Sequence, residues 1–160
     1  GNEYELFPAA GQRKLAERLI DSGVDVIIGT HPHVIQPIEI IKTEDSKGIV
    51  LYSLGNFISN QRWRYSDAGI IVYLQIRKNL VLNEVEVAVQ DITPTWVHKY
   101  QENGKWKFKV LPVEDTLVRE TFNVESAEED NKLTLQDYER LKEIPGETEE
   151  IFWRYQQCGS

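Results

Sequence analysis

The sequence predicts an α/β fold, in which helices cover a sheet of short apolar strands. The residues from Ala9 to Ser22 follow a helical pattern, and Gly23 then ends the helix before the apolar run Val24–Ile28. A helix, a glycine and a buried strand in this order form an αβ unit. Two further signals favour strands: Ile70–Ile76 is rich in β-branched residues, and Asn103-Gly104, a strong hairpin dipeptide, lies between two β-like runs.

The remaining elements follow from the same patterns in chain order. Within the first helix, one face holds Leu15, Ala16, Leu19 and Ile20, and the other largely holds Gln12, Arg13, Lys14 and Arg18. Apolar runs and alternation predict further strands over Val34–Lys42, Ile49–Leu54, Leu80–Gln90, Thr95–Tyr100 and Lys105–Val113, with a polar turn over Thr43–Gly48. The chain is therefore expected to be largely β from residue 34 to residue 113.

A change of composition near Arg119 separates this part from the C-terminal end. Acidic residues outnumber basic ones between Arg119 and Glu150. The pattern there predicts two helices, Leu133–Glu143 and Glu147–Gln157, with Pro145-Gly146 between them. We therefore expect a first domain over residues 1–118 and an acidic helical appendage over residues 119–160 that packs back on the β part.

Composition argues against several functional classes. The net charge of -8 argues against nucleic acid as a main partner, because a phosphate backbone requires a basic surface. No apolar stretch is long enough to span a membrane, and no signal-like segment opens the chain. Cys158 is the single cysteine, so it is either a bystander thiol or a link between two copies. Since the chain starts at Gly1 and contains no methionine, we expect it to be a fragment.

Two histidines give the clearest sign of function. His31 and His33 lie in Gly29-Thr30-His31-Pro32-His33, directly after the predicted buried strand. Catalytic groups collect at such strand ends in open α/β sheets, and histidine is the commonest metal ligand. Pro32 restricts its own φ angle and favours an extended conformation before it, so the two imidazoles form a preset pair. The pair predicts a metal-dependent hydrolase; the alternative is two histidines that only satisfy backbone carbonyl groups.

Asn56 and Glu39 are further candidates. Asn56 follows a predicted strand in Tyr52-Ser53-Leu54-Gly55-Asn56-Phe57 and can offer its amide to an oxyanion, a metal or a backbone group. A strand that ends in a tight turn explains the same residues. Glu39 lies on a predicted strand close behind the histidines. It is either a carboxylate that orients a metal-binding imidazole or a solvated strand residue.

Aromatic residues near the predicted hairpin form a third group. Trp96, Tyr100 and Trp106 could bind a carbohydrate or another polymer, but packing across the strands is the favoured interpretation. His98 alternates with these aromatic residues and has no nearby partner in the sequence. We therefore expect His98 to be structural or exposed.

A set of these segments occurs in a characteristic order. It comprises Glu3-Tyr4 before Pro8, the run from Ile20 to His33, Gln36-Pro37-Ile38-Glu39 and the run from Tyr52 to Phe57. Together they resemble the bacterial capsule synthesis proteins of the CapA type, which act in poly-gamma-glutamate capsule biosynthesis and belong to the calcineurin-like metallophosphoesterase superfamily. The resemblance is specific from about Glu3 to Ile76 and looser up to Val113.

The resemblance implies a four-layer fold with two β-sheets face to face and helices outside. This chain would be its C-terminal half, with a β-hairpin extension and acidic C-terminal helices. The resemblance also implies a site for two divalent metal ions of the manganese, zinc or iron type. In that site His31 and His33 are metal ligands, Asn56 belongs to the catalytic site, and Glu39 lies behind them.

The superfamily's early Asp-x-His, Gly-Asp and Asn-His motifs are absent from this sequence. Because two metals need several Asp, Asn and His ligands, we expect the isolated chain to bind metal weakly or not at all and to be inactive. The parent protein would be a hydrolase of cell-surface polymer metabolism that acts on a surface polymer or a phosphoester. The alternative is a non-catalytic binding or scaffold component of a capsule assembly or export complex.

Partners and location are expected on the same basis. Half of a double-sheet domain exposes sheet edges, which invite pairing with another chain. The expected partner is therefore the missing N-terminal half of the domain, or a second copy in a homodimer. The implied location is extracellular, at the cell surface or the membrane, through an anchor that this chain lacks.

Overall fold

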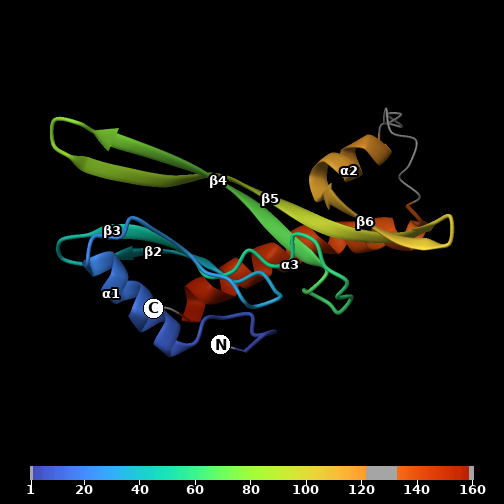
Figure 1. The fold of residues 1–160 in the computed structure, drawn as a ribbon, viewed down its shortest axis with the longest axis horizontal. Helices are drawn as coiled ribbons and strands as arrows, with labels where there is room; N and C mark the ends of the chain where they lie inside the picture. The colour runs from blue at the N-terminus through green and yellow to red at the C-terminus, as the bar shows by residue number, and fades with distance from the viewer. Residues whose placement is uncertain (1, 122–132, 159–160) are drawn as a thin grey trace.

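The structure is a computed structural model that describes residues 2–121 and 133–158. In chain order the elements are α1 (Ala10–Asp21), β1 (Val26–Ile28), β2 (Ile38–Lys42), β3 (Lys47–Leu51), β4 (Ala68–Asn79), β5 (Glu84–Glu102), β6 (Lys105–Pro112), α2 (Val113–Thr121) and α3 (Leu135–Cys158). These mixed helices and strands confirm the predicted α/β class. Figure 1 shows an elongated molecule in which α3 runs along much of its length. None of the helices in the described ranges is long and apolar enough to cross a membrane.

The first sheet has the order β1-β3-β2. β1 runs parallel to β3, and β2 runs antiparallel to it. One face of this sheet packs against α1, because Ala16 and Ile20 of the helix join a core cluster with Ile41, Val50 and Tyr52. The predicted αβ unit is thus confirmed, with β1 at the edge of the sheet. The strand expected over Val34–Lys42 begins only at Ile38, and the residues before it form the loop that carries the histidines.

The second sheet has the order β4-β5-β6 and is antiparallel throughout. The predicted hairpin at Asn103-Gly104 is confirmed: both residues have left-handed φ angles, 50° and 73°, as a tight two-residue turn requires. The separate strands expected over Leu80–Gln90 and Thr95–Tyr100 are wrong as drawn, because β5 is one unbroken strand. The apolar residues Leu80–Leu82, at the start of the first predicted strand, form a turn before β5. The side chain of Asn79 closes this turn by accepting hydrogen bonds from the N–H groups of Val81 and Leu82 at 3.0 and 3.1 Å.

The two sheets meet near the start of β4. The N–H of Ile70 donates to the carbonyl of Leu54 at 2.9 Å, and the N–H of Asn56 donates to the carbonyl of Ala68 at 3.1 Å. Ile35 and Ile70 form a core cluster here with Ile151 of α3. The loop after β3, which carries Asn56, is therefore fixed between both sheets.

The C-terminal region differs from the prediction in two ways. α2 was not expected, and the domain boundary drawn at residue 118 falls inside it. The two predicted acidic helices are one helix, α3, with Pro145 in its interior. An internal proline costs about 3 kcal/mol because it removes a helical hydrogen bond. Leu141, Ile144 and Ile151 are buried on one stripe that crosses Pro145, and burying each such side chain contributes about 1.5–3 kcal/mol, which outweighs that cost.

A buried ion-pair network fastens α3 to the start of β4. The guanidinium of Arg140 contacts Asp67 at 2.8 Å and Glu147 at 2.9 Å, and the indole N–H of Trp96 donates to Asp67 at 2.9 Å. Burial alone would raise the pKa of Asp67, but the hydrogen bonds from Arg140 and Trp96 outweigh it and lower that pKa. The acidic C-terminal helix is thus part of the core and does not pack only at its surface.

His98 is buried beneath α3 in a stack of aromatic rings. Its ring centroid lies 5.4 Å from that of Trp96 and 5.1 Å from that of Tyr100. Neither ring nitrogen has a hydrogen-bond partner among the described residues, and Nδ1 is 4.0 Å from Asp137 Oδ1. Trp96 is also buried, as the favoured packing interpretation expects, whereas Trp106 is 56% exposed; His98 has the expected structural position.

We predict that His98 makes stability depend on pH. Burial lowers the pKa of His98 below its ordinary value of 6.5, and the charges of Arg62 and Lys109 lower it further, against the opposing effect of Asp137. The unfolded chain therefore binds a proton at a higher pH than the native protein does. The free energy of unfolding should accordingly fall as the pH drops below 6.5.

The variant His98→Phe keeps a ring in the stack and removes the titration. Urea unfolding near neutral pH and at about pH 5.5 should show a smaller loss for this variant than for the native chain. The carboxylates Asp67 and Glu39 lose their stabilising effect only at lower pH, below their ordinary pKa values of 3.8 and 4.5. An equal pH dependence in the native chain and the variant would contradict this assignment.

Candidate functional site

The loop after β1 holds the histidine pair in a fixed position. The N–H of Gly29 donates to the carbonyl of Leu51 at 2.7 Å, and a Cβ atom at Gly29 would collide with the carbonyl oxygen of Tyr52. Farther along, the hydroxyl of Ser53 donates to the carbonyl of Pro32 at 3.1 Å. The N–H of His33 donates to the carbonyl of Glu3 at 2.7 Å. The loop is therefore anchored on both sides of His31.

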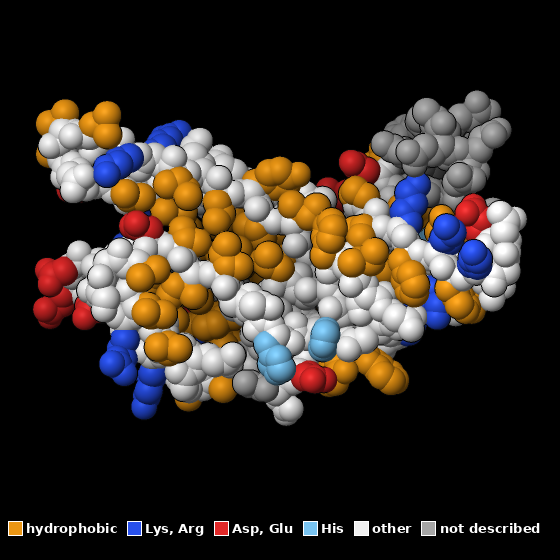
Figure 2. All heavy atoms as spheres, viewed as in Figure 1, with side chains coloured by type: hydrophobic (Ala, Val, Ile, Leu, Met, Phe, Trp, Pro, Cys, Tyr) orange, Lys and Arg blue, Asp and Glu red, His pale blue; other side chains and the backbone are white. Residues whose placement is uncertain are grey.

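His31 has an unusual backbone conformation and an exposed side chain. Its φ angle is 103°, a region that residues other than glycine rarely adopt. Such a conformation costs about 1–3 kcal/mol and persists only where the surroundings enforce it, most often at functional sites. Here the backbone hydrogen bonds of Gly29 and His33 hold the loop on both sides of His31 and so maintain its φ angle. Figure 2 shows the surface histidines close together on one face of the molecule.

The orientation of His33 is set by Asn56. Nδ1 of His33 lies 2.9 Å from Oδ1 of Asn56. The amide nitrogen of Asn56 faces three acceptors, namely the carbonyls of His33 and Ser66 and Oε1 of Gln61. The oxygen of the amide must therefore face the imidazole, so Nδ1 carries the proton. Nε2 of His33 is left with a free lone pair and has no hydrogen-bond partner among the described residues.

Tyr4, Gln61 and Ser66 are parts of this arrangement that sequence reasoning missed. Gln61 accepts from Asn56 at 3.2 Å and donates to the hydroxyl of Tyr4 at 3.2 Å. The ring of Tyr4 lies 6.1 Å from that of His33. No spacing in the sequence links these residues, because the chain separates Tyr4 from Gln61 by 57 positions.

Gly55 allows Asn56 to reach its place. Its φ angle is 72°, and a Cβ atom there would lie 2.7 Å from the carbonyl oxygen of Ala68. A larger residue would therefore be strained in both conformation and space. The tight turn predicted at the end of this strand is present. The turn brings Asn56 into contact with His33.

Glu39 lies elsewhere in the structure. Its carboxylate accepts hydrogen bonds from Arg13 at 2.7 Å, Tyr52 at 2.8 Å and Tyr155 at 2.7 Å. Burial alone would raise the pKa of Glu39, but the hydrogen bonds from Tyr155, Tyr52 and Arg13 outweigh it and lower that pKa. The structure thus does not bring Glu39 to the imidazoles, nor does it leave the carboxylate solvated. Glu39 joins α1, the first sheet and α3.

The donors that the structure brings together suit part of a metal site. His33 offers a neutral ring nitrogen, and the exposed His31 is two residues away. Metal-binding histidines commonly donate their second ring N–H to an oxygen acceptor, as His33 does to Asn56. Within the described ranges, no group of three or more His, Cys, Asp or Glu side chains is placed to hold one ion.

Comparisons with known proteins place related sequences beside the N-terminal part of the chain. Residues 1–61 match the profile of a family described as Bacterial capsule synthesis protein PGA_cap. The chain is similar to the capsule biosynthesis protein CapA of Bacillus anthracis, with 36% identity over 96 residues that cover 59% of this chain and 22% of that protein. It is also similar to the PGA biosynthesis protein CapA of Bacillus subtilis (strain 168), with 35% identity over 101 residues that cover 62% of this chain and 26% of that protein.

The chain thus spans about a quarter of the length of these curated relatives. No solved structure matches it. The family match covers all the candidate site residues, from His31 through Glu39 to Asn56. Over its matched N-terminal part, the chain is similar to the bacterial capsule synthesis proteins of the CapA type.

Proposed function

We propose that the parent protein is a metal-dependent, phosphoesterase-like hydrolase of capsule polymer biosynthesis. In this proposal the chain supplies some of the metal ligands of its active site. The observation that carries the proposal is the hydrogen bond between His33 and Asn56. It fixes the imidazole as the tautomer whose Nε2 lone pair is free. That tautomer and a fixed ring orientation are what a histidine needs to bind a divalent cation.

His33 and His31 would hold a divalent cation of the manganese, zinc or iron type. Such a cation lowers the pKa of a bound water and stabilises negative charge on phosphoryl oxygens. Two imidazoles leave most of a coordination shell unfilled, because even a single catalytic zinc usually has three protein ligands. The remaining ligands would therefore come from other parts of the parent protein, and binding by this chain alone would be weak.

Asn56 acts in this proposal as a positioning residue. Its oxygen faces His33, and its nitrogen is engaged by three acceptors, so the amide has little capacity left for substrate. His31, with its exposed side chain, would face the substrate, which is a surface polymer or a phosphoester. Glu39 would support the site only indirectly, through the packing of α1 and α3 on the first sheet.

We also propose that the rest of the domain covers the open side of the two sheets. β1 is an edge strand, and Ile28 on β1 and Ile40 on β2 are 61% and 56% exposed. An edge and an apolar face of this kind favour pairing with another segment. In the isolated chain a second copy would take that place. The similarity to capsule biosynthesis proteins also supports a role for the parent protein at the cell surface.

Hydrolysis of a chromogenic phosphodiester in the presence of manganese or zinc tests the proposed activity. We expect turnover by the intact parent protein, loss of turnover in its His31→Ala/His33→Ala variant, and none by the isolated chain. Rapid turnover by the isolated chain would contradict the shared site. An intact double variant that hydrolyses at the native rate would contradict the role of the histidines.

The second candidate function is a non-catalytic component of a capsule assembly or export complex. It is favoured by the lack of a third metal-binding side chain near the histidines in the described ranges. Capsule formation by cells that carry the folded double variant separates the two functions. Normal capsules would favour the scaffold, and their loss would favour the metal site.

A further inference from the structure

The N-terminal segment of residues 3–5 lies against the loop that carries the histidines. The carbonyl of Glu3 accepts a hydrogen bond from the N–H of His33 at 2.7 Å. The ring of Tyr4 lies 6.1 Å from the ring of His33. The carbonyl of Glu5 accepts a hydrogen bond at 2.9 Å from Nε2 of Gln36, whose side chain is buried. The backbone contacts on either side of Tyr4 therefore hold this residue beside His33.

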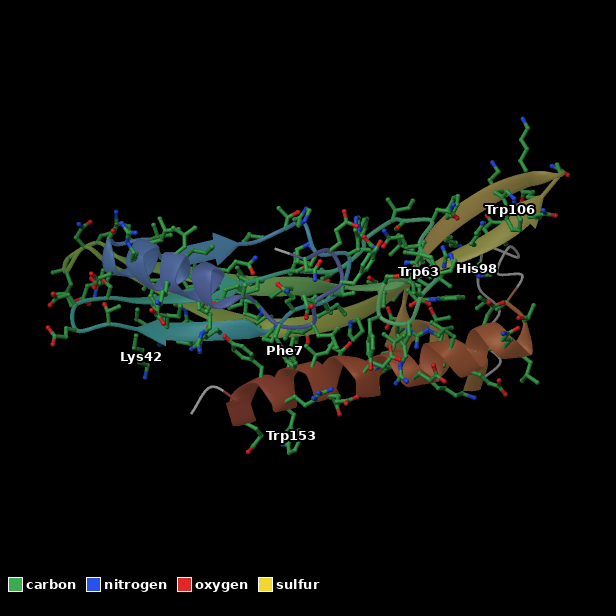
Figure 3. The ribbon with its side chains drawn as sticks, turned by 90° about the horizontal axis from the view of Figure 1, so that it is seen from below. Phe7, Lys42, Trp63, His98, Trp106 and Trp153 are labelled. Carbon is green, nitrogen blue, oxygen red and sulfur yellow. The ribbon has the colours of Figure 1, made fainter. Side chains whose placement is uncertain are left out.

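The same segment is fastened again at its next two residues. Leu6 packs against the core cluster that contains Ile35. The ring of Phe7 stacks on that of Tyr155 in α3, with centroids 6.2 Å apart and an angle of 16° between the planes. Figure 3 shows Phe7 beside α3. Because the segment is fixed in this way, Tyr4 would lose little conformational freedom when it binds a ligand.

A chain of hydrogen bonds decides how the hydroxyl of Tyr4 is used. Nδ2 of Asn56 donates to Oε1 of Gln61 at 3.2 Å, so the amide nitrogen of Gln61 must point the other way. That nitrogen donates to Oη of Tyr4 at 3.2 Å. A tyrosine hydroxyl can accept one hydrogen bond and still donate its own proton. Within the described ranges no acceptor takes this proton, and the side chain of Tyr4 is 48% exposed.

The amide of Asn56 thus orients two groups that lie side by side. Its oxygen faces Nδ1 of His33, which leaves the lone pair on Nε2 free. Its nitrogen acts through Gln61 and leaves the hydroxyl proton of Tyr4 free. A cation at the imidazole and a hydroxyl donor next to it are the two kinds of group that stabilise the oxygens of a phosphoryl group.

We propose that Tyr4 is a substrate-binding residue that donates a hydrogen bond to a phosphoryl oxygen, and that Gln61 is the positioning residue that orients its hydroxyl. This role rests on the proposed metal site. Glu3 and Glu5 are exposed on either side of Tyr4, and their carboxylates would repel an anion unless a cation is bound at the histidines. Binding of an anion at Tyr4 should therefore require the metal.

Binding of inorganic phosphate to the intact parent protein in the presence of zinc, measured by isothermal titration, tests the role of Tyr4. Tyr4→Phe should weaken phosphate binding at least about tenfold, because the lost hydrogen bond has a charged acceptor. Its zinc affinity should stay within about twofold of the native value, because both histidines remain. The matched control Tyr73→Phe removes the hydroxyl of a tyrosine on β4 that is 52% exposed, and it should bind phosphate like the native protein.

Gln61→Leu tests the positioning role in a double-mutant cycle with Tyr4→Phe. Alone, Gln61→Leu should weaken phosphate binding several-fold, because the hydroxyl of Tyr4 is no longer oriented. Added to Tyr4→Phe, it should have little further effect, because the hydroxyl on which it acts is already gone. An equal effect of Gln61→Leu in both backgrounds would contradict its action through Tyr4.

The readouts distinguish a failure of the Tyr4 assignment from a failure of the metal site. Thermal unfolding of each variant shows whether it is folded. Zinc binding by the native protein without zinc-dependent phosphate binding, or native phosphate affinity in folded Tyr4→Phe, would overturn the role of Tyr4 alone. An equal loss in Tyr73→Phe would do the same. No zinc binding by the intact native protein would overturn both the metal site and this role.

Discussion

Replacing Arg140 by leucine is expected to lower the free energy of unfolding by about 3–5 kcal/mol. The side chains of Asp67 and Glu147 are only 8% and 6% exposed, and both pair with this one guanidinium. Without Arg140, Asp67 would lose the guanidinium that pairs with it, and Glu147 would keep only its contact with the largely exposed Arg64. The expected loss is therefore mostly the penalty of unpaired buried charge and exceeds what the pairs add to stability when intact.

The network also fixes how this loss depends on pH. Arg140 keeps the pKa of Asp67 below its ordinary value of 3.8, so its stabilising effect is present above that pH and is lost as the pH falls through the lowered value. In Arg140→Leu, burial is no longer opposed and the pKa of Asp67 should rise. The difference in stability between the native chain and the variant should therefore shrink in acid.

Urea unfolding of Arg140→Leu beside Arg154→Leu measures the effect. Arg154 lies on the same helix and pairs with Glu150 at 3.4 Å, but both side chains are about half exposed. Exposed pairs of this kind contribute about 0.3–0.5 kcal/mol. Equal effects of the two substitutions would contradict the view that the buried network holds α3 in place.

Replacing Asn56 by leucine is expected to weaken zinc binding at the histidine pair by about 10–100-fold. The reason is orientation, because His31 and His33 both remain in the variant. Leucine offers no acceptor to Nδ1 of His33, so the imidazole can rotate and its proton can move to Nε2. The nitrogen that would bind the metal is then no longer fixed or reliably free.

Two further substitutions make this prediction specific. Asn60→Leu alters an exposed residue of the same loop and should leave zinc affinity unchanged. Asn56→Asp keeps an oxygen toward Nδ1 and should retain most of the affinity, although it loses the donors to Ser66 and His33 and should be less stable. Isothermal titration with zinc, together with thermal unfolding, separates the two effects. Unchanged affinity in folded Asn56→Leu would contradict the positioning role.

Elements encoded by local patterns could be predicted from the sequence. The first helix, the strand before the histidines and the Asn103-Gly104 turn each depend on side chains within a few residues of one another. The turn after β4 could not be read in this way, because Leu80 to Leu82 resemble a strand. Its cause is the side chain of Asn79, whose oxygen accepts two backbone N–H groups.

Features that depend on residues far apart in the chain could not be predicted from the sequence. Pro145 indicates a break, yet α3 continues because its buried stripe packs on strands far away in the chain. Glu39 lies near the histidines in the sequence, but its carboxylate accepts a hydrogen bond from Tyr155, 116 positions away. The candidate site shows both cases. The closeness of His31 to His33 along the chain is visible in the sequence, whereas the contact between His33 and Asn56 depends on how the two sheets meet.

Nitrogen-15 NMR of the histidine rings, recorded during a titration with zinc, tests the central claim most directly. We predict that free His33 is protonated at Nδ1 and unprotonated at Nε2, and that zinc shifts the Nε2 resonances of His33 and His31 together. The buried His98 should not respond. A proton on Nε2 of His33 in the free chain, or zinc shifts that spare both His31 and His33, would contradict a metal site on this loop.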